Sequence, residues 1–363
     1  MPVTEESAPY DAFLLVSFGG PEGPDEVIPF LENVTRGRGI PRSRLDQVAE
    51  HYYLSGGVSP INAQCRELIT AIRASFAEKG PGLPVYWGNR NWRPYLAETV
   101  QQLARDGVRR AIAVVTSADS SFSGCRQYQD DIERARELAG PGAPAIDKLR
   151  PYFNHPGFVE PLAEHTRAAL ATLPAAVRDH AHLVFTAHSV PTAMAARSGP
   201  HGGAYEAQLS EVARLVSARV DGGAHPWRLV YQSRSGPPSQ PWLEPDVAGY
   251  LEQLGRRGAA AVVLVPAGFV SDHMEVRYDL DVHATDLAKR LGIAVVRAAT
   301  PGTHPRFAEM VRELVAERLQ DDPERLALGA LGPSPDACPV GCCAYARPGS
   351  AATEAVSRVG RGR

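Results

Sequence analysis

The sequence lacks the features that define several broad classes of protein. Its 38 lysines and arginines are outnumbered by 41 aspartates and glutamates, and the net charge is −3. No basic excess is therefore available to attract nucleic acid or an acidic membrane surface. No apolar run approaches the roughly 20 residues of a membrane-spanning helix, and the acidic N-terminus is unlike a secretory signal. We expect a cytoplasmic protein without a transmembrane segment.

Cysteine is also scarce, and its distribution is uneven. The chain has five cysteines among its 363 residues. They are Cys65, Cys125, Cys338, Cys342 and Cys343. An odd number argues against a disulfide framework in a reducing compartment, where clustered cysteines more often bind metal or carry out redox chemistry.

Short β-branched runs alternate with amphipathic helical patterns. The predicted strands are residues 13–17, 85–88, 111–116, 183–187, 228–232, 261–266 and 293–297. Three sets of apolar residues have the spacing of one helix face. They are Cys65, Leu68, Ile69, Ile72 and Phe76; Leu209, Val212, Leu215 and Val216; and Phe307, Val311, Leu314 and Val315. This alternation predicts an α/β fold of two similar doubly wound, Rossmann-like domains with parallel sheets. We place them at residues 1–177 and 178–322, followed by a Gly/Pro-rich, cysteine-bearing tail at 323–363.

Ligands of doubly wound sheets bind beyond the carboxyl ends of the strands. Gly19 and Gly20 follow the first strand there, but neither the G-x-G-x-x-G pattern nor a Walker lysine occurs, which disfavours nucleotide chemistry. A hydroxyl-rich loop at residues 117–123 follows another strand. Its serines suit either a carboxylate ligand or the cap of the next helix.

His188 ends a predicted strand, and Glu275, Asp279 and His283 recur at intervals of four on the helix expected after residue 272. Such a row is either a solvated helix face or a relay for a divalent cation or protons, and a π-type widening would align it better. We expect Ser271 or Asp272 to cap this helix, with Asp272 and His273 as orienting residues. His188 and Glu275 would then pair a near-neutral base with an acid for proton transfer.

Five motifs, in order, give the chain a resemblance to the ferrochelatase family, of the coproporphyrin-using bacterial kind. They are the residues SFGGPE at 17–22, SPI at 59–61, TAHSVP at 186–191, YQSRSGP at 231–237 with PWL at 241–243, and the segment 268–278. The resemblance covers about residues 10–320. It implies insertion of Fe²⁺ into a porphyrin, with release of two protons, in haem biosynthesis.

The resemblance also assigns roles to residues. His188 and Glu275 would face each other across the macrocycle pocket, with His188 either accepting a pyrrole proton or ligating the iron. The row of Glu275, Asp279 and His283 would carry iron in or protons out, although relatives often have an acid where His283 stands. Phe18 occupies a position that is often an axial tyrosine, and a phenyl ring cannot ligate iron.

The same resemblance implies how the substrate is held. Arg36 or Arg38, Ser59 and Ser121 would anchor the propionates, because arginine pairs with carboxylate in a bidentate manner; either arginine could instead be plain surface. Coproporphyrin III, with four propionates, is favoured over protoporphyrin IX because no apolar membrane-docking lip is evident.

Some relatives bind a [2Fe–2S] cluster through one internal and three C-terminal cysteines. Cys65 lies on an apolar helix face and is expected in the core, which leaves Cys125, Cys338, Cys342 and Cys343 as the four ligands that such a cluster requires. Zinc, or incidental thiols in a disordered tail, are the alternatives. A structural or sensing role is expected of the cluster.

Other functions remain open at this point. One is insertion of cobalt or nickel into another tetrapyrrole by a chelatase of similar fold, and another is a non-catalytic, haem-binding iron–sulfur sensor. Expected partners are porphyrin and ferrous iron, with transient contact to neighbouring haem-pathway enzymes and none to nucleic acid.

Overall fold

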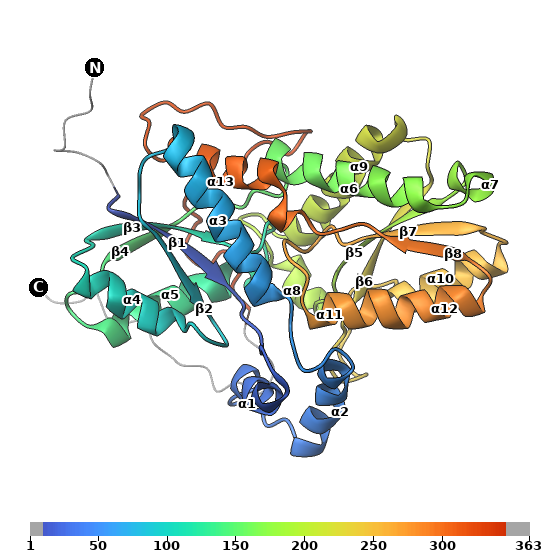
Figure 1. Ribbon diagram of the computed structural model, residues 1–363, viewed down its shortest axis with the longest axis horizontal. Helices are drawn as coiled ribbons and strands as arrows, with labels where there is room; N and C mark the ends of the chain where they lie inside the picture. The colour runs from blue at the N-terminus through green and yellow to red at the C-terminus, as the bar shows by residue number, and fades with distance from the viewer. Residues whose placement is uncertain (1–9, 346–363) are drawn as a thin grey trace, which may run out of the picture.

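Eight short parallel strands form two separate sheets in the computed structural model, which describes residues 10–345 (Figure 1). The first sheet has the order β2-β1-β3-β4 and consists of β1 (Ala12–Ser17), β2 (Val85–Asn89), β3 (Arg110–Val115) and β4 (Ala145–Lys148). The second has the order β6-β5-β7-β8 and consists of β5 (His182–His188), β6 (Trp227–Gln232), β7 (Ala261–Val265) and β8 (Ala294–Arg297). Each sheet starts at an inner strand and winds outward in the same order. The predicted pair of similar α/β units is therefore confirmed.

The expectation of seven strands was wrong by one, because β4 went unrecognised. Its sequence is AIDK, and only Ile146 is buried. Asp147 accepts hydrogen bonds from Tyr10 Oη at 2.9 Å and from Arg110 Nη2 at 2.6 Å. An edge strand with one buried side chain lacks the apolar run by which the inner strands are recognised.

The inner strands are covered on both faces, as their continuous apolar sequences predict. Along β1, Phe13 and Leu15 pack into one hydrophobic cluster, while Leu14 and Val16 pack into another on the opposite face. The outer face of the first sheet is covered by α4 (Leu96–Arg105) and α5 (Gln127–Ala139). That of the second is covered by α10 (Val247–Arg256), α11 (Met274–Val276), η2 (Arg277–Ala284) and α12 (Thr285–Arg290).

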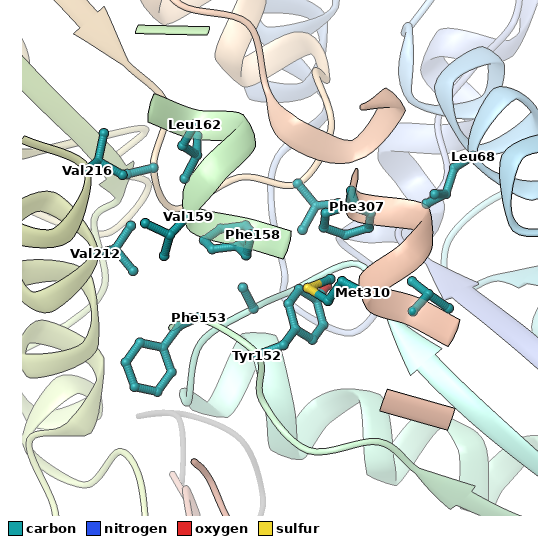
Figure 2. Packing of buried hydrophobic residues seen from close by; sticks show 14 of the residues in the cluster. Leu68, Tyr152, Phe153, Phe158, Val159, Leu162, Val212, Val216, Phe307 and Met310 are labelled. Carbon is teal, nitrogen blue, oxygen red and sulfur yellow. The ribbon is translucent and has the colours of Figure 1, made fainter. Parts of the chain in front are cut away.

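One layer of four helices covers the remaining face of both sheets. It consists of α3 (Ile61–Lys79), α6 (Pro156–Thr172), α9 (Ala204–Asp221) and α13 (Pro305–Glu317) (Figure 1). Figure 2 shows Phe158 of α6 beside Phe307 and Tyr152 in this layer; Tyr152 stacks edge-on against both rings. The three predicted helix faces all point into it or its margin, and Cys65 is fully buried there, as expected. The core thus runs continuously between the halves, and the boundary at residue 177 stays a prediction.

Two further groups of elements complete the described chain. The helices α1 (Pro24–Val34) and α2 (Arg42–Tyr53) form a pair with their own small apolar cluster, set apart from both sheets (Figure 1). Shorter elements are η1 (Phe122–Arg126), α7 (Ala175–Arg178), α8 (Thr192–Ala196) and η3 (Pro301–Thr303). No helix among residues 10–345 has the length and apolar character needed to cross a membrane.

The segment after α13 contains no helix or strand up to residue 345, in agreement with the loss of periodicity from about residue 320. Buried side chains fix its course. Arg150 forms a bidentate ion pair with Glu317 and also donates to Leu326 O at 3.0 Å. Asn154 donates to Leu328 O and Gly332 O. The predicted tail is thus attached to the helical layer before it reaches its cysteines, and residues 346–363 lie outside the described chain.

Candidate active site

His188 is the last residue of β5 and lies at the carboxyl edge of the second sheet. Its backbone oxygen accepts a 2.7 Å hydrogen bond from Tyr205 Oη of α9, and its Nδ1 contacts Ser189 O at 2.5 Å. These contacts leave Nε2 free to point away from the sheet. The side chain is one-third exposed, so a ligand can reach it.

Glu275 reaches the same edge from the neighbouring strand β7. The chain leaves β7, forms a loop over residues 266–273 and enters the short helix α11. His273, and not Ser271 or Asp272, is the N-cap residue, and it makes no side-chain cap hydrogen bond. The predicted cap was therefore wrong. The Asp272 carboxylate accepts hydrogen bonds from Arg297 and Thr300, so it is not available to cap the helix.

His188 and Glu275 are brought to the same sheet edge, as their strand positions predict, with Nε2 3.5 Å from Oε2. The expectation that they face each other across the macrocycle pocket was wrong, because this distance leaves no room for a ring between them and places both on one side. Burial opposes protonation of His188, but the charge and hydrogen bond of Glu275, helped by Ser189 O and Asp279, outweigh it and raise its pKa. Burial likewise opposes ionisation of Glu275, but His188 and His273 hold its pKa well below the usual range. The pair therefore holds a carboxylate beside an imidazole that changes protonation state above its ordinary pH.

The remaining residues of the predicted row lie on η2, which is a π-helix over Arg277–Ala284. The π-type widening that would align the row better is therefore present. Burial raises the pKa of Asp279, with a further contribution from Glu275, although the Ser233 hydroxyl donates to its Oδ2 and opposes the shift. His283 is exposed further along and lowers the Asp279 pKa through its charge. Glu275 and His283 are exposed and Asp279 is partly buried between them, so the row starts at the sheet edge and follows the π-helix.

The candidate substrate-binding residues lie mostly on the first sheet's side. Phe18 follows β1, is 37% exposed and packs edge-on against Phe30. Ser59 is buried against Gly20, where an added Cβ would come within 2.7 Å of its hydroxyl. Ser121 caps η1 by accepting from Gly124 N at 2.8 Å, which is the alternative role considered for this loop. Arg36 and Arg38 are both exposed in the connection between α1 and α2.

The end of α2 lies against the π-helix, a contact that the sequence did not predict. The rings of His51 and Tyr278 stack with centroids 3.6 Å apart and planes 9° from parallel. Burial, with the nearby Glu275 charge, raises the pKa of Tyr52. A cavity of about 220 Å³ adjoins this contact and is lined by Ser55, Val58, Pro60, Met274 and Arg277. The end of α2 and the connection that follows it therefore border the space next to Glu275.

Three polar side chains of this region were missed by sequence reasoning. Gln232 donates to Glu275 O at 3.3 Å, Ser233 to Asp279, and Arg297 binds two carboxylates of the Glu275 segment. Gln232 is the last residue of β6 and Ser233 follows it, and both belong to a motif that carries the family resemblance. Their position at a strand end could have identified them as site residues. Arg297 ends β8 in the same way.

The cysteines expected to bind a cofactor gather at the junction of η1, the tail and residue 199. Lys148 Nζ donates to Cys125 Sγ at 3.2 Å, and Gly199 N donates to Cys343 Sγ at 3.0 Å. Hydrogen bonds from Cys338 and Cys343, together with Lys148, lower the pKa of Cys125 despite its burial. Cys342 Sγ lies 3.8 Å from Cys343 Sγ. Four sulfur atoms from distant parts of the sequence therefore meet, while Cys65 hydrogen-bonds to Ser17 elsewhere.

Within residues 10–345, no three His, Cys, Asp or Glu side chains are arranged to hold one metal ion. This argues against a mononuclear zinc site among the four cysteines, since such a site needs its ligands around a single point. A [2Fe–2S] cluster divides four ligands between two irons. It therefore does not require three ligands around a single point. His188, Glu275, Asp279 and His283 likewise form a row and not a closed ligand shell.

The chain is similar to known proteins over most of its length. The family model described as Ferrochelatase matches residues 10–319. A coproporphyrin III ferrochelatase from Streptomyces coelicolor is 55% identical, with 98% of this chain and 99% of that protein aligned. One from Streptomyces griseus is 56% identical, with 97% and 98% aligned.

Among solved structures, SirB from Bacillus subtilis, determined with Fe³⁺, matches with a TM-score of 0.51. The two chains are 13% identical, and the match covers 85% of this chain and 96% of that one. This likeness supports the two-sheet architecture only.

Proposed function

The chain belongs to the ferrochelatase family, and on that premise we propose that it inserts Fe²⁺ into coproporphyrin III through His188 and Glu275. The observation that carries the residue assignment is the 3.5 Å approach of His188 Nε2 to Glu275 Oε2 at the open edge of the second sheet. Insertion of iron into a porphyrin is a step of haem biosynthesis, and the two Streptomyces relatives described above are coproporphyrin III ferrochelatases.

The reaction exchanges two pyrrole protons for one Fe²⁺, so the site must remove protons while a cation arrives. Neutral His188 presents its Nε2 beside Glu275, where it can accept a pyrrole proton or ligate the incoming iron. Glu275 remains ionised, and its negative charge favours both an imidazolium and a divalent cation beside it. Asp279 and His283 continue this polar row toward solvent, which gives protons or iron a path along η2.

We place the macrocycle beside the His188–Glu275 pair, on the side that Phe18 and the cavity residues border. Phe18 offers an exposed ring on the side of the first sheet, and Val58 lines the cavity beside Met274 and Arg277. We assign Arg36 or Arg38, with Ser59 and Ser121, to the propionates, because guanidinium groups bind carboxylates with paired hydrogen bonds. Four propionates on coproporphyrin III give such groups more partners than the two on protoporphyrin IX.

We also propose that Cys125, Cys338, Cys342 and Cys343 hold a [2Fe–2S] cluster. Their sulfur atoms converge, and the hydrogen bond from Lys148 Nζ helps to stabilise the Cys125 thiolate. When bound, the cluster supplies a one-electron centre and a cross-link between η1 and the tail. Because metal insertion needs no electron transfer, the role is structural or sensing.

Two features of location and partnership remain proposals. None of the five cysteines is paired in a disulfide, which fits a reducing compartment, so we place the enzyme in the cytoplasm. Transient contact with neighbouring haem-pathway enzymes is expected because the product must be passed on.

The test is anaerobic metallation of coproporphyrin III and, separately, protoporphyrin IX, followed by the Soret band of the porphyrin. We expect turnover with coproporphyrin III, and its loss in His188→Ala and in Glu275→Gln. The matched control is His304→Ala, which removes a histidine paired with Glu164 at 3.0 Å away from the site. No turnover with either porphyrin, or full activity in His188→Ala, would contradict the proposal. Faster turnover with Co²⁺ or Ni²⁺ would favour a different tetrapyrrole chelatase.

A further inference from the structure

Arg297 binds both ends of the segment that carries Glu275. Its guanidinium forms five hydrogen bonds: Nε to Asp281 Oδ1 at 2.5 Å, Nη1 to Asp272 Oδ1 at 3.1 Å and to Ala298 O at 3.2 Å, and Nη2 to Asp272 Oδ2 at 2.9 Å and to Asp281 Oδ2 at 3.1 Å. These five bonds match the five N–H groups of the guanidinium. Its side chain is 15% exposed, so the cation is largely withdrawn from solvent.

The two carboxylates stand on either side of the candidate catalytic residues. Asp272 lies in the loop before α11, and Asp281 lies inside the π-helix η2, so Glu275 and Asp279 fall between them. Arg297 itself belongs to β8, the outer strand next to β7. The segment leaves β7, and the guanidinium of the adjacent strand fastens it at two points.

Further contacts at Asp272 fix the first of these points. Thr300 Oγ1 donates to Asp272 Oδ1 at 3.1 Å, and the backbone N–H of Asp272 donates to Gln64 Oε1 of α3 at 2.7 Å. Gln64 belongs to the first half of the chain. The start of the Glu275 segment is therefore located relative to both halves, including the side on which Phe18 lies.

We propose that Arg297 is a positioning residue for metal insertion, holding Glu275 and the π-helix in register with His188. This inference rests on the roles proposed above for His188 and Glu275. A π-helix is rare and has to be held by its surroundings. The contacts that hold the π-helix therefore determine the position of Glu275. A displacement of about 1 Å at a catalytic group lowers the rate about 100-fold.

A lysine cannot replace this arrangement. It has three donors on one nitrogen and cannot span two carboxylates in the planar, forked manner of arginine. In Arg297→Lys the contact with one of the two carboxylates is lost. The positive charge that balances buried Asp272 remains. The substitution thus separates geometry from charge.

The experiment compares Arg297→Lys with Arg150→Lys in the full-length protein. Arg150 is a matched control, because it too is a buried arginine with a bidentate carboxylate partner, Glu317, and it contacts no residue of the site in the described chain. We would measure the melting temperature, kcat, and KM for Fe²⁺ and for coproporphyrin III. In Arg297→Lys we expect kcat to fall about 10–100-fold with KM for the porphyrin unchanged. In Arg150→Lys we expect a lower melting temperature with wild-type kcat.

A folded Arg297→Lys protein with wild-type kcat would overturn the inference, as would an equal loss of kcat in Arg150→Lys. If Arg297→Lys does not fold, Asp281→Asn decides, because it weakens the contact of Arg297 with the π-helix and leaves its contact with Asp272 intact. Asp281 also pairs with Arg277 at 3.0 Å, so Arg277→Gln is assayed beside it to separate the two contacts. We expect a smaller loss of kcat there, and wild-type kcat would reject the role. Wild-type protein and Glu275→Gln are assayed alongside. If wild type fails to metallate porphyrin, or Glu275→Gln remains fully active, the proposed function itself fails, independently of Arg297.

Discussion

His188 Nε2 lies 3.5 Å from Glu275 Oε2, although the two residues are far apart in sequence and follow different strands. β5 and β7 pair in parallel, so both chains leave the second sheet at the same edge. The contact therefore follows from the topology of the sheet together with the short helix that turns Glu275 back toward β5. Because each residue shifts the pKa of the other, the pair acts as one titrating unit.

The first prediction concerns the titration of His188. Its pKa in the folded protein is raised above the ordinary 6.5. Activity that needs the neutral imidazole should therefore increase as the pH rises through this raised pKa. Glu275→Gln removes the main charge that raises it and leaves burial, which lowers it. We expect His188 to titrate at a lower pH in this variant, as measured by NMR of histidine-labelled protein. The control, Glu164→Gln beside His304, should leave His188 unchanged, and equal titration in wild type and Glu275→Gln would contradict the coupling.

The second prediction tests the packing behind His188. Gly268 follows β7, and a Cβ added there would lie 2.6 Å from Ala187 Cβ and 2.9 Å from Ala187 Cα. Gly268→Ala must therefore displace the end of β5, next to His188. We expect the free energy of unfolding to fall by about 1–3 kcal/mol and kcat to fall as well. Gly142→Ala is the control, since no atom lies within 4 Å of its added Cβ. Unaltered stability and rate in Gly268→Ala would show that β5 yields without effect.

The third prediction concerns Phe18, whose exposed ring has no lone pair for iron. Phe18→Tyr adds a phenol oxygen that can ligate ferric iron. We expect ferric coproporphyrin bound to this variant to show a new charge-transfer absorption band and slower product release. Phe18→Leu should show no such band. Identical spectra for wild type and Phe18→Tyr would mean that residue 18 does not face the metal.

The fourth prediction addresses the four gathered cysteines. Protein purified anaerobically should absorb in the visible range and contain two irons per chain, as a [2Fe–2S] cluster requires. Cys343→Ser should lose both signals, because Cys343 Sγ sits between Gly199 N and Cys125. Cys65→Ala should keep both, since Cys65 is buried in the core and bonded to Ser17. Colourless, iron-free wild-type protein would contradict the cluster.

The inner strands and the helix faces were predicted well from the sequence, because both have recognisable patterns of apolar residues. The buried residues of β1 and the face of α3 that holds Cys65 and Ile72 are examples. Prediction from the sequence failed where a polar group has a distant partner. β4 was missed because Asp147 binds Tyr10 and Arg110, and the cap at Asp272 was wrong because Arg297 binds that carboxylate.

The site shows the same division. His188 and Glu275 were found because each stands at or after a strand end. The stack of His51 on Tyr278 was not found, because it joins α2 to η2 and no local spacing relates two such elements. Contacts of this kind depend on how α1 and α2 dock, which is set by packing across the molecule.

The helical layer shared by the two sheets has a consequence for protein engineering. α13 is the last helix of the described residues in sequence order. It nevertheless packs on α3 of the first half as well as on α6. A chimera that joined the first half of this chain to the second half of a relative would therefore place a foreign α13 against the native α3. Exchanges between relatives should move these two helices together, even though more than 200 residues separate them in the sequence.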